Sequence, residues 1–517
     1  MISNLQSLEK KLDFLARHVP LSLLIIGVVS FLSRLNYFPY QVPLALDAFG
    51  YFLYATDTSI LGHLPTGYAL PNNGWPIFVS FFFMLFHSNN FLDYMTLQRI
   101  VSISVSTLTV IPVYLLARRF FDKRYSLIGA LLFAFEPHII QNSLLGITEP
   151  LYIFLISVAL FLFLCDRLKV IYLSFAVAAL CAMVRYEGIF LFILLSIMFF
   201  VHFRKERKIL PRYAIALGVF VLLLLPMAYV RIQTMGYDGL TSHWTAGVKA
   251  SVTLSSEGSS THSNSLLHFV GGGFENLTKY LGWTSLPFWI FFVPTGVYLI
   301  LKERNYKNAF LILGLIILSV PSLYAYSREI PDPRYLYVLF PSYSVISLFT
   351  IRKIIERTRN WNLLLVLTAC AVLISCAAYL DIKQYNYGHQ LEAYNTDKFI
   401  FKTATGVNDF YPEDSYLSPS GLPDNWPVLK SALPPQTQKI STSGFNSLQN
   451  YIKNSRANGL THLVVDDQQA RPNFLNDVFY HEKKYPYLIK IYDSTDFNYK
   501  YHIKVYNIDY DKFDSHE

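Results

Sequence analysis

Charged residues are scarce in this sequence of 517 residues. Asp, Glu, Lys and Arg make up 15% of it, compared with about 25% in a soluble globular protein. Hydrophobic residues make up 53%, and apolar runs that could cross a bilayer as helices recur between residues 20 and 381. No such run follows. We therefore predict a polytopic α-helical membrane domain over residues 1–381 and a small soluble α/β domain over residues 382–517.

The sequence is also poor in cysteine and lacks two common functional motifs. Its four cysteines lie in or beside apolar runs, and the C-terminal domain has none, so no disulfide framework is expected there. It contains no Cys/His spacing typical of a zinc site and no GxxxxGK[ST] phosphate loop. We expect no cofactor, with a divalent cation as the weaker alternative.

Eleven apolar runs are candidates for membrane spans. They cover roughly residues 20–37, 96–117, 125–142, 149–165, 170–184, 187–203, 213–231, 283–301, 308–326, 335–351 and 361–380. A further run, Trp75–Phe86, is only about 12 residues long, which favours an interfacial or re-entrant segment. The predicted count of about eleven spans depends on leaving this run out.

The distribution of basic residues gives the predicted spans a direction. Alternate short loops of the eleven-span arrangement hold most of the lysines and arginines of residues 1–381. The positive-inside rule then places the N-terminus in the cytoplasm and the C-terminal domain outside a cell membrane. Lipid head groups and this rule account for the net charge of +8, so we predict no nucleic-acid partner.

Two long loops fall on the predicted outer side, over residues 38–95 and 232–282. The first contains Phe49–Ser59, a candidate interfacial helix, and the second contains Gly271–Gly273 and is expected to be a mobile lid.

The C-terminal domain shows alternating strand and helix signals. Thr461–Asp466 is the clearest strand, Ile489–Tyr492 and His502–Ile508 are further ones, and Ser415–Pro419 and Lys439–Ser443 are candidates. Helices are predicted over Ser447–Ser455 and Pro472–Tyr485. This order suggests a small Rossmann-like layer with a structural or acceptor-docking role.

Three ionisable residues on the outer side are candidates for catalysis or binding, because a charge at membrane depth is costly. Asp47 follows the first span and could be a general base, a helix cap for residues 48–59, or both. His138 and Glu149 lie in the next outer loop, where Glu149 could instead be a helix N-terminal charge. Asp47, His138 and Glu149 are also residue types that bind a divalent cation.

Two arginine clusters complete the predicted outer surface. Arg185 and Glu187 lie in the turn RYEG, where they could pair with each other or where Arg185 could face an anionic ligand. Arg334 and Tyr335 enter a late span, as phosphate-binding residues or as interfacial anchors. One or two acids beside two or three arginines suit a lipid-linked phosphate substrate whose leaving group is anionic.

The order of these motifs resembles the GT-C glycosyltransferases, which use polyprenyl-phosphate sugars. Protein O-mannosyltransferases and aminoarabinose transferases are the most similar types. The resemblance covers about residues 20–380. It rests on Asp47 followed by NNGWPIF (residues 72–78), LQRIVS (97–102) with PVYLLARRFF (112–121), EPLY (149–152), RYEG (185–188) and RYL (334–336). The sequence departs from the family where an acid pair is usual, since Ala48 follows Asp47.

The resemblance implies a membrane glycosyltransferase that moves a sugar, a mannose-like hexose or a pentose, from a polyprenyl-phosphate donor by inverting displacement. The acceptor is a lipid, glycan or protein on the outer face. Asp47 is implied as the base and Glu149 as the second acid, while Arg185 and Arg334 hold the lipid phosphate. Competing readings are a transporter or flippase of lipid-linked sugars, a non-catalytic assembly subunit, and an oligosaccharyltransferase-like enzyme with a metal.

Overall fold

The computed structural model describes most of the chain as two compact units. The described residues are 17–40, 42–44, 47–65, 73–88, 91–239, 265–303, 305–330, 332–358, 361–383, 392, 395, 399, 440, 442, 444–467, 471–500 and 502–516. One unit comprises Met1–Phe38 and Asp47–Ile382, and the other comprises Pro39–Leu46 and Lys383–Glu517. Each unit has its own hydrophobic core.

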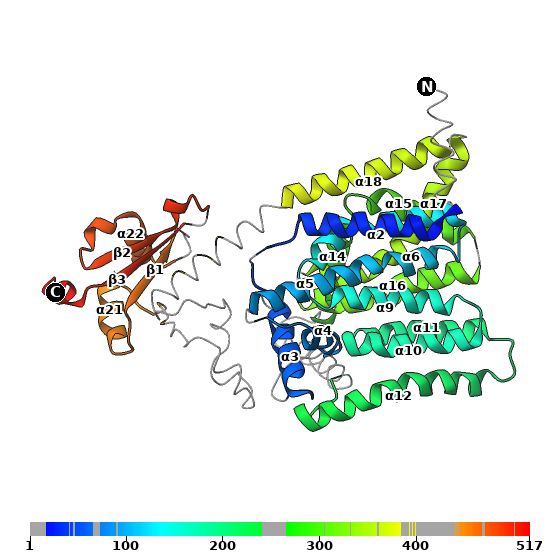
Figure 1. Cartoon of the computed structure of the whole chain (residues 1–517), viewed down its shortest axis with the longest axis horizontal. Helices are drawn as coiled ribbons and strands as arrows, with labels where there is room; N and C mark the ends of the chain where they lie inside the picture. The colour runs from blue at the N-terminus through cyan, green and yellow to red at the C-terminus, as the bar shows by residue number, and fades with distance from the viewer. Residues whose placement is uncertain are drawn as a thin grey trace. The chain divides into compact units, whose positions relative to one another are not determined.

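The first unit is a bundle of helices. In chain order they are α2 (Val19–Asn36), α3 (Asp47–Leu61), α4 (Gly74–Leu85), α5 (Phe91–Leu108), α6 (Val110–Ala117), α7 (Lys123–Ala134), α8 (Pro137–Ser143), α9 (Glu149–Phe163), α10 (Leu168–Val184), α11 (Gly188–His202), α12 (Ile209–Met235), α14 (Ser265–Thr284), α15 (Trp289–Lys302), α16 (Tyr306–Ser327), the 3-10 helix η2 (Pro333–Leu339), α17 (Phe340–Thr358) and α18 (Trp361–Lys383). In Figure 1, α9, α10, α11 and α12 run along one another, while α3 crosses near one end of this layer.

Local sequence signals explain where several of these helices begin. The Asp122 side chain accepts hydrogen bonds from the backbone N–H groups of Arg124 and Tyr125 at the start of α7, and Asn305 caps α16 through the N–H of Asn308. Glu149 and Pro150 open α9, where an acid suits the helix N-terminus and proline loses no hydrogen bond.

Helices that could cross a membrane are present in the described part of the chain. Five are long and apolar enough by length and composition, or six if the bent pair of α14 and α15 counts as one span. Five further apolar helices are shorter, including α4, α9, α10 and α11. Every one of the eleven predicted runs lies on helix, whereas the number of spans stays a prediction.

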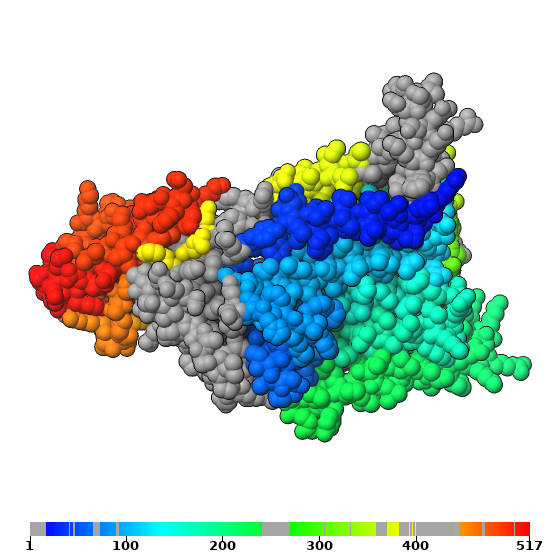
Figure 2. Space-filling model, viewed as in Figure 1, coloured from blue at the N-terminus to red at the C-terminus, as the bar shows by residue number. Residues whose placement is uncertain are grey.

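The lipid-facing surface of this unit is visible in its outermost helices. Figure 2 shows α2 in dark blue and α12 in green, both open on the surface. Each exposes several large apolar side chains, such as Leu24 and Leu32 on α2 and Leu222 and Leu225 on α12. Exposed apolar rows of this kind belong in hydrocarbon, where helical backbone satisfies its own hydrogen bonds.

Three predicted features differ from the structure. The predicted span 125–142 is broken into α7 and α8 at Glu136–Pro137, because proline cannot continue the hydrogen-bond ladder. The predicted span 283–301 begins at a bend of 113° between α14 and α15. The predicted outer loop 232–282 is helical over residues 265–282, since Gly271–Gly273 lie inside helix α14, and its role as a lid stays a prediction; residues 240–264 lie outside the described residues.

The second unit contains a small three-stranded sheet packed with helices. Strands β1 (His462–Asp466), β2 (Leu488–Asp493) and β3 (Ile503–Ile508) are ordered β1-β3-β2, and both pairs are antiparallel. Helices α21 (Leu448–Arg456), α22 (Asn473–Tyr480) and α23 (Tyr510–Ser515) supply side chains to its core, including Ile452, Val478 and Phe513.

The strands and helices predicted between residues 447 and 508 are therefore present, but the Rossmann-like arrangement is wrong for them. That arrangement needs parallel strands joined by crossover helices, whereas β3 pairs antiparallel with both neighbours. The candidate strand Ser415–Pro419 and most of Lys439–Ser443 lie outside the described residues.

Candidate functional site

A cavity of about 200 Å³ in the first unit gathers most of the predicted site residues. Four chain segments form it: the start of α3, residues 147–149 before and at the start of α9, the turn between α10 and α11, and the residues at the start of η2. Its lining residues are Asp47, Tyr51, Ile147, Thr148, Glu149, Arg185, Tyr186, Glu187, Asp332, Arg334 and Tyr335. A smaller apolar extension continues from Glu149 and Arg185 toward Leu318 and Pro321 of α16.

Asp47 is the accessible carboxylate of this cavity. It is the first residue of α3, and its side chain is 64% exposed. One oxygen lies 3.6 Å from the Nη2 of Arg334, which is an ion pair without a tight hydrogen bond. Tyr51 follows one turn later and therefore shares this face of α3. Asp47 is thus both the first acid of the helix and a group open to a ligand.

Glu149, Arg185 and Glu187 form a buried charge cluster on the opposite side of the cavity. Arg185 donates through Nη1 to Glu149 at 2.5 Å and through Nη2 to Glu187 at 2.8 Å. Its guanidinium carbon also lies 5.8 Å from the ring centre of Tyr152 and 5.5 Å from that of Tyr335. Burial alone would lower the pKa of Arg185, but Glu187 and Glu149 raise it well above its ordinary value. Arg185 is therefore a fixed cation.

Arg334 is the more accessible of the two arginines. Its Nη2 pairs with Asp332 at 2.5 Å, its Nε donates to the same carboxylate at 2.6 Å, and its side chain is 29% exposed. Asp332 also caps η2 by accepting from the Arg334 N–H. Arg185 and Glu187 pair with each other and both line the cavity, whereas an anionic ligand facing Arg185 stays a prediction.

Carboxylates outnumber guanidinium groups in this cavity. Asp47, Glu149, Glu187 and Asp332 face Arg185 and Arg334, so the ionised set carries a formal charge of −2 from four acids and two arginines. Burial raises the pKa of the Tyr51 hydroxyl, and the nearby Arg185 charge offsets this only in part. Tyr51 therefore remains a neutral hydrogen-bond donor at the edge of an acidic site.

Two glycines allow the chain to place these charges. A methyl group at Gly188 would lie 2.5 Å from the backbone nitrogen of Ala182, so the turn RYEG closes tightly only without a side chain there. A methyl group at Gly74 would lie 2.7 Å from the backbone of Met183. Gly74, at the start of α4, is thus packed against the backbone at the end of α10, just before Arg185.

A buried glutamine connects the two acid-bearing segments. The Nε2 of Gln98, on α5, donates to the carbonyl of Ala48 at 3.0 Å and to that of Gly146 at 2.7 Å. Trp75 donates to the same Gly146 carbonyl at 3.2 Å, and Arg99 donates to Leu144 at 3.0 Å. The motif LQRIVS therefore fixes the backbone next to Asp47 and the loop before Glu149.

His138 lies apart from the other predicted site residues. It is 2% exposed, its Nδ1 is 2.8 Å from Glu136, and its Nε2 is 3.1 Å from the Tyr379 hydroxyl of α18. After the break at Pro137, His138 points into the interior of the helix bundle, away from the residues that line the cavity. Among the described residues no group of three His, Cys, Asp or Glu side chains could hold a metal ion, so Asp47, His138 and Glu149 do not fit a cation site.

Several lining residues were not assigned from the sequence. Asp332 belongs to a cluster that the sequence shows, but nothing local indicates that its carboxylate holds Arg334. Tyr51 could have been found from its spacing of four from Asp47 on a helix. Thr148 and Tyr186 carry no signal beyond their neighbours Glu149 and Arg185.

Comparison with known proteins agrees with this fold. The family model described as "dolichyl-phosphate-mannose-protein mannosyltransferase" matches residues 74–229, which include α4 to α11 and most of α12. This range contains Glu149, Arg185 and Glu187, together with Gln98 and both tight glycines. The comparison with curated proteins gave no match.

Solved structures with a similar fold include two of the Archaeoglobus fulgidus oligosaccharyltransferase. The complex with Zn and sulfate has a TM-score of 0.52 and 17% identity, covering 81% of this chain and 59% of that chain. The form tethered to an acceptor peptide with the NVT sequon has a TM-score of 0.51 and 15% identity, covering 86% and 69%. This chain thus spans about 59% of the length of the first of them.

The family match over residues 74–229 and the shared fold make this chain similar to membrane glycosyltransferases.

Proposed function

We propose that the chain transfers a sugar from a polyprenyl-phosphate donor to a lipid, glycan or protein acceptor, and that the reaction takes place in the cavity around Asp47 and Arg334. The observation that carries this proposal is the convergence of four segments on one cavity, with an exposed acid beside an accessible arginine. A base for the acceptor and a cation for the leaving phosphate are the two groups that such a transfer requires.

The proposed reaction is a single inverting displacement. The acceptor hydroxyl oxygen attacks the anomeric carbon of the sugar while Asp47 takes the hydroxyl proton. The bond between that carbon and the phosphate oxygen breaks, and its electron pair leaves with the polyprenyl phosphate. Arg334 stabilises the negative charge that grows on this leaving group. One displacement inverts the configuration at the anomeric carbon.

The two arginines of the cavity differ in how firmly carboxylates hold them, and we therefore propose different roles for them. Arg185 is held between two buried carboxylates, whereas the ion pair of Arg334 with Asp332 is partly exposed. An incoming phosphate can therefore compete with Asp332 for Arg334 more easily than with Glu149 for Arg185. We assign phosphate binding to Arg334, and we assign Glu149 and Glu187 to positioning Arg185 and Tyr335 at the cavity wall.

No step in this proposal uses a metal ion, since the described residues include no group of three His, Cys, Asp or Glu side chains that could hold one. Orientation enters as part of the proposal: the basic loops are cytoplasmic, and the cavity and the C-terminal unit lie on the outer side of a cell membrane.

The test is a transfer assay with the purified full-length protein, a radiolabelled polyprenyl-phosphate sugar and a membrane extract as acceptor. Arg334→Gln should lower kcat/KM by about 100-fold, the usual effect of removing one transition-state donor. Arg328→Gln is the matched control, since Arg328 is a nearby exposed arginine that does not line the cavity. It should change kcat/KM by less than about threefold.

Three outcomes of this assay would contradict the proposal. Equal loss in both arginine variants would point to a general charge effect, and an unaffected Arg334→Gln enzyme would remove the assigned phosphate ligand. Movement of the labelled lipid across liposomes without transfer would favour a flippase. Loss of transfer on treatment with EDTA, restored by a divalent cation, would show that a metal takes part.

A further inference from the structure

A second and larger cavity lies at the far end of the same helices. Its volume is about 930 Å³, within the usual range for ligand pockets. It is formed where α11 ends at His202 and α16 begins at Tyr306, whereas α11 starts at Gly188 beside the catalytic cavity. Fifteen residues of helix separate the two ends of α11, which is roughly 20 Å. The two cavities therefore cannot share one ligand head group.

One wall of this second cavity is apolar and open. It consists of side chains from the end of α15 and the first half of α16, namely Ile300, Leu301, Ala309, Ile312, Leu313 and Ile316. Leu301 is 60% exposed and Ile316 is 58% exposed, although both belong to helices of the membrane unit. Such a wall suits a hydrocarbon chain rather than water.

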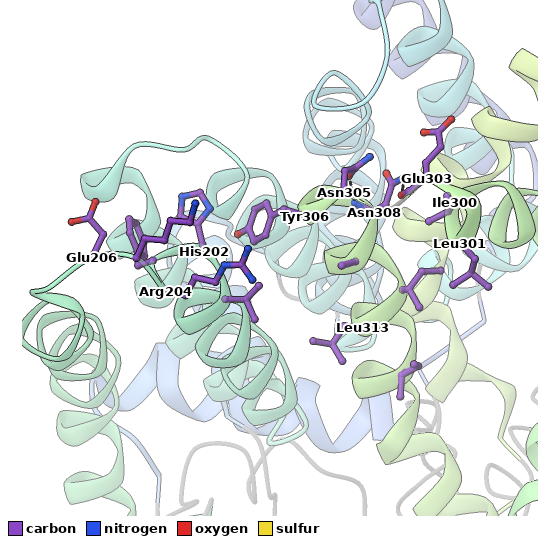
Figure 3. Close-up of a pocket in the computed structure, with 16 residues that line it drawn as sticks. His202, Arg204, Glu206, Ile300, Leu301, Glu303, Asn305, Tyr306, Asn308 and Leu313 are labelled. Carbon is purple, nitrogen blue, oxygen red and sulfur yellow. Dashed lines mark hydrogen bonds between the residues drawn. The ribbon is translucent and has the colours of Figure 1, made fainter.

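The opposite wall ends in a cationic rim. His202, Arg204 and Lys205 come from the end of α11 and the loop after it, and Figure 3 shows His202 and Arg204 on the side of the cavity that faces Tyr306 and Asn305. Within the described part of the chain, neither Arg204 nor Lys205 forms an ion pair. The acid Glu206 on the same rim is paired with Arg212 at 3.0 Å.

A polar group at the boundary between the two walls lacks a partner. The Tyr306 hydroxyl is buried and makes no hydrogen bond to any described residue, and its ring centre lies 4.8 Å from that of His202. A buried hydroxyl without a partner costs about 1–3 kcal/mol. A ligand oxygen placed between Tyr306 and Arg204 would remove that cost.

We propose that this cavity binds one anionic phospholipid from the leaflet at the end of the bundle opposite the catalytic cavity. Its acyl chain would lie along the apolar wall, and its phosphate would bind to Arg204, Lys205 and the Tyr306 hydroxyl. Two unpaired cations above an apolar wall favour an anionic head group over a zwitterionic one. The lipid then joins the end of α11 to the connection between α15 and α16. This proposal is independent of the proposed glycosyl transfer.

The test measures lipid retention by native mass spectrometry of the full-length protein. The protein is equilibrated with phosphatidylglycerol, with phosphatidylcholine of the same acyl chains, and with glycerol 3-phosphate as a soluble phosphate. Wild-type protein should retain one phosphatidylglycerol at least about tenfold more strongly than phosphatidylcholine. The double variant Arg204→Ala/Lys205→Ala should lose this preference.

The matched control removes the same charge from the same loop. Arg207 and Lys208 lie between α11 and α12 but do not line the cavity, so Arg207→Ala/Lys208→Ala should keep the preference. A third variant, Ala309→Trp, fills the apolar wall and should reduce retention of both lipids. Thermal unfolding of each variant shows that it is folded.

The proposal is overturned by any of three results. Equal loss in both double variants would mean a diffuse attraction to anionic membranes. Displacement of phosphatidylglycerol by glycerol 3-phosphate would indicate a soluble phosphate ligand, and displacement by an equimolar polyprenyl phosphate would indicate a second site for the donor lipid.

Discussion

Gln98 illustrates how much of this site depends on a residue that touches no substrate. Its amide is fully buried and holds two carbonyls, one beside Asp47 and one in the loop before Glu149. A shift of either segment by 1 Å would misplace a charge that the reaction needs.

Replacing Gln98 should therefore slow the reaction more than it weakens binding. Gln98→Leu is expected to lower kcat by about 10- to 100-fold with a smaller change in KM. It should also lower the free energy of unfolding by about 1–3 kcal/mol, because two buried carbonyls each lose one donor, although Trp75 still donates to that of Gly146. Steady-state kinetics and thermal unfolding measure the two effects. Ser102→Ala is the control, since Ser102 is buried one turn further along α5 and its hydroxyl has no hydrogen-bond partner among the described residues. A loss of kcat equal to that of the control would contradict the positioning role.

Most of the charged residues that line the cavity could be predicted from the sequence by their residue type. Asp47, Glu149, Arg185, Glu187, Arg334 and Tyr335 line one cavity, although their catalytic roles stay predictions. His138 could not be excluded from sequence, because its partner Tyr379 lies 241 residues away and its direction depends on the break at Pro137. The role of Asp332 as the partner of Arg334 could not be predicted for a similar reason, since it depends on the shape of η2.

The turn RYEG between α10 and α11 is the structural element that fixes Arg185 and Glu187 together. Gly188 approaches the backbone of Ala182 so closely that a side chain there must move one helix relative to the other. Displacement of this turn would open the charge cluster around Arg185.

Gly188→Ala should therefore reduce both stability and activity. Overpacking against backbone costs about 1–3 kcal/mol, and kcat should fall by about tenfold or more because Arg185 moves. The control is Gly218→Ala in α12, where nothing lies within 4 Å of the added methyl group. That change should be neutral or slightly stabilising, as alanine favours helix. If the two variants unfold at the same temperature and react at the same rate, the tight turn is not needed.

The helices themselves could be predicted from the sequence. A long apolar run in lipid must satisfy its own backbone hydrogen bonds, and a helix is one of the few structures that does so. Both of the breaks in these helices carry a proline, Pro137 after α7 and Pro287 between α14 and α15. A proline predicts a break but not its angle, which is 113° between α14 and α15. In the second unit, strand positions followed from apolar alternation, whereas antiparallel pairing depends on contacts between β3 and both neighbours that no local pattern encodes.

The topology of the whole membrane unit decides whether the cavity residues share one face. The short helix α4 is the deciding element, because counting it as a span would reverse every later loop. Five of the described helices are long and apolar enough to span. Length and composition do not orient a helix, so the predicted direction of the chain comes from the basic loops.

Labelling of single cysteines in intact cells tests this topology. In a variant without native cysteines, Ser88→Cys should react with a membrane-impermeant maleimide from outside, because the loop after α4 is predicted to be extracytoplasmic. Lys123→Cys, before α7, should react only after the cells are opened. The reverse pattern would mean that α4 crosses the membrane and that the predicted orientation is wrong.

The central claim is that Asp47 is the base of a glycosyl transfer. The most direct measurement is the transfer rate of Asp47→Asn with saturating polyprenyl-phosphate sugar, compared with Asp93→Asn, which removes an acid near the start of α5 that does not line the cavity. Asp47→Asn should lower kcat by about 1,000-fold, within the usual contribution of a general base, while its thermal unfolding and donor binding stay close to those of the wild type. The Asp93→Asn enzyme should retain its activity. Transfer by folded Asp47→Asn protein at the wild-type rate would contradict the account.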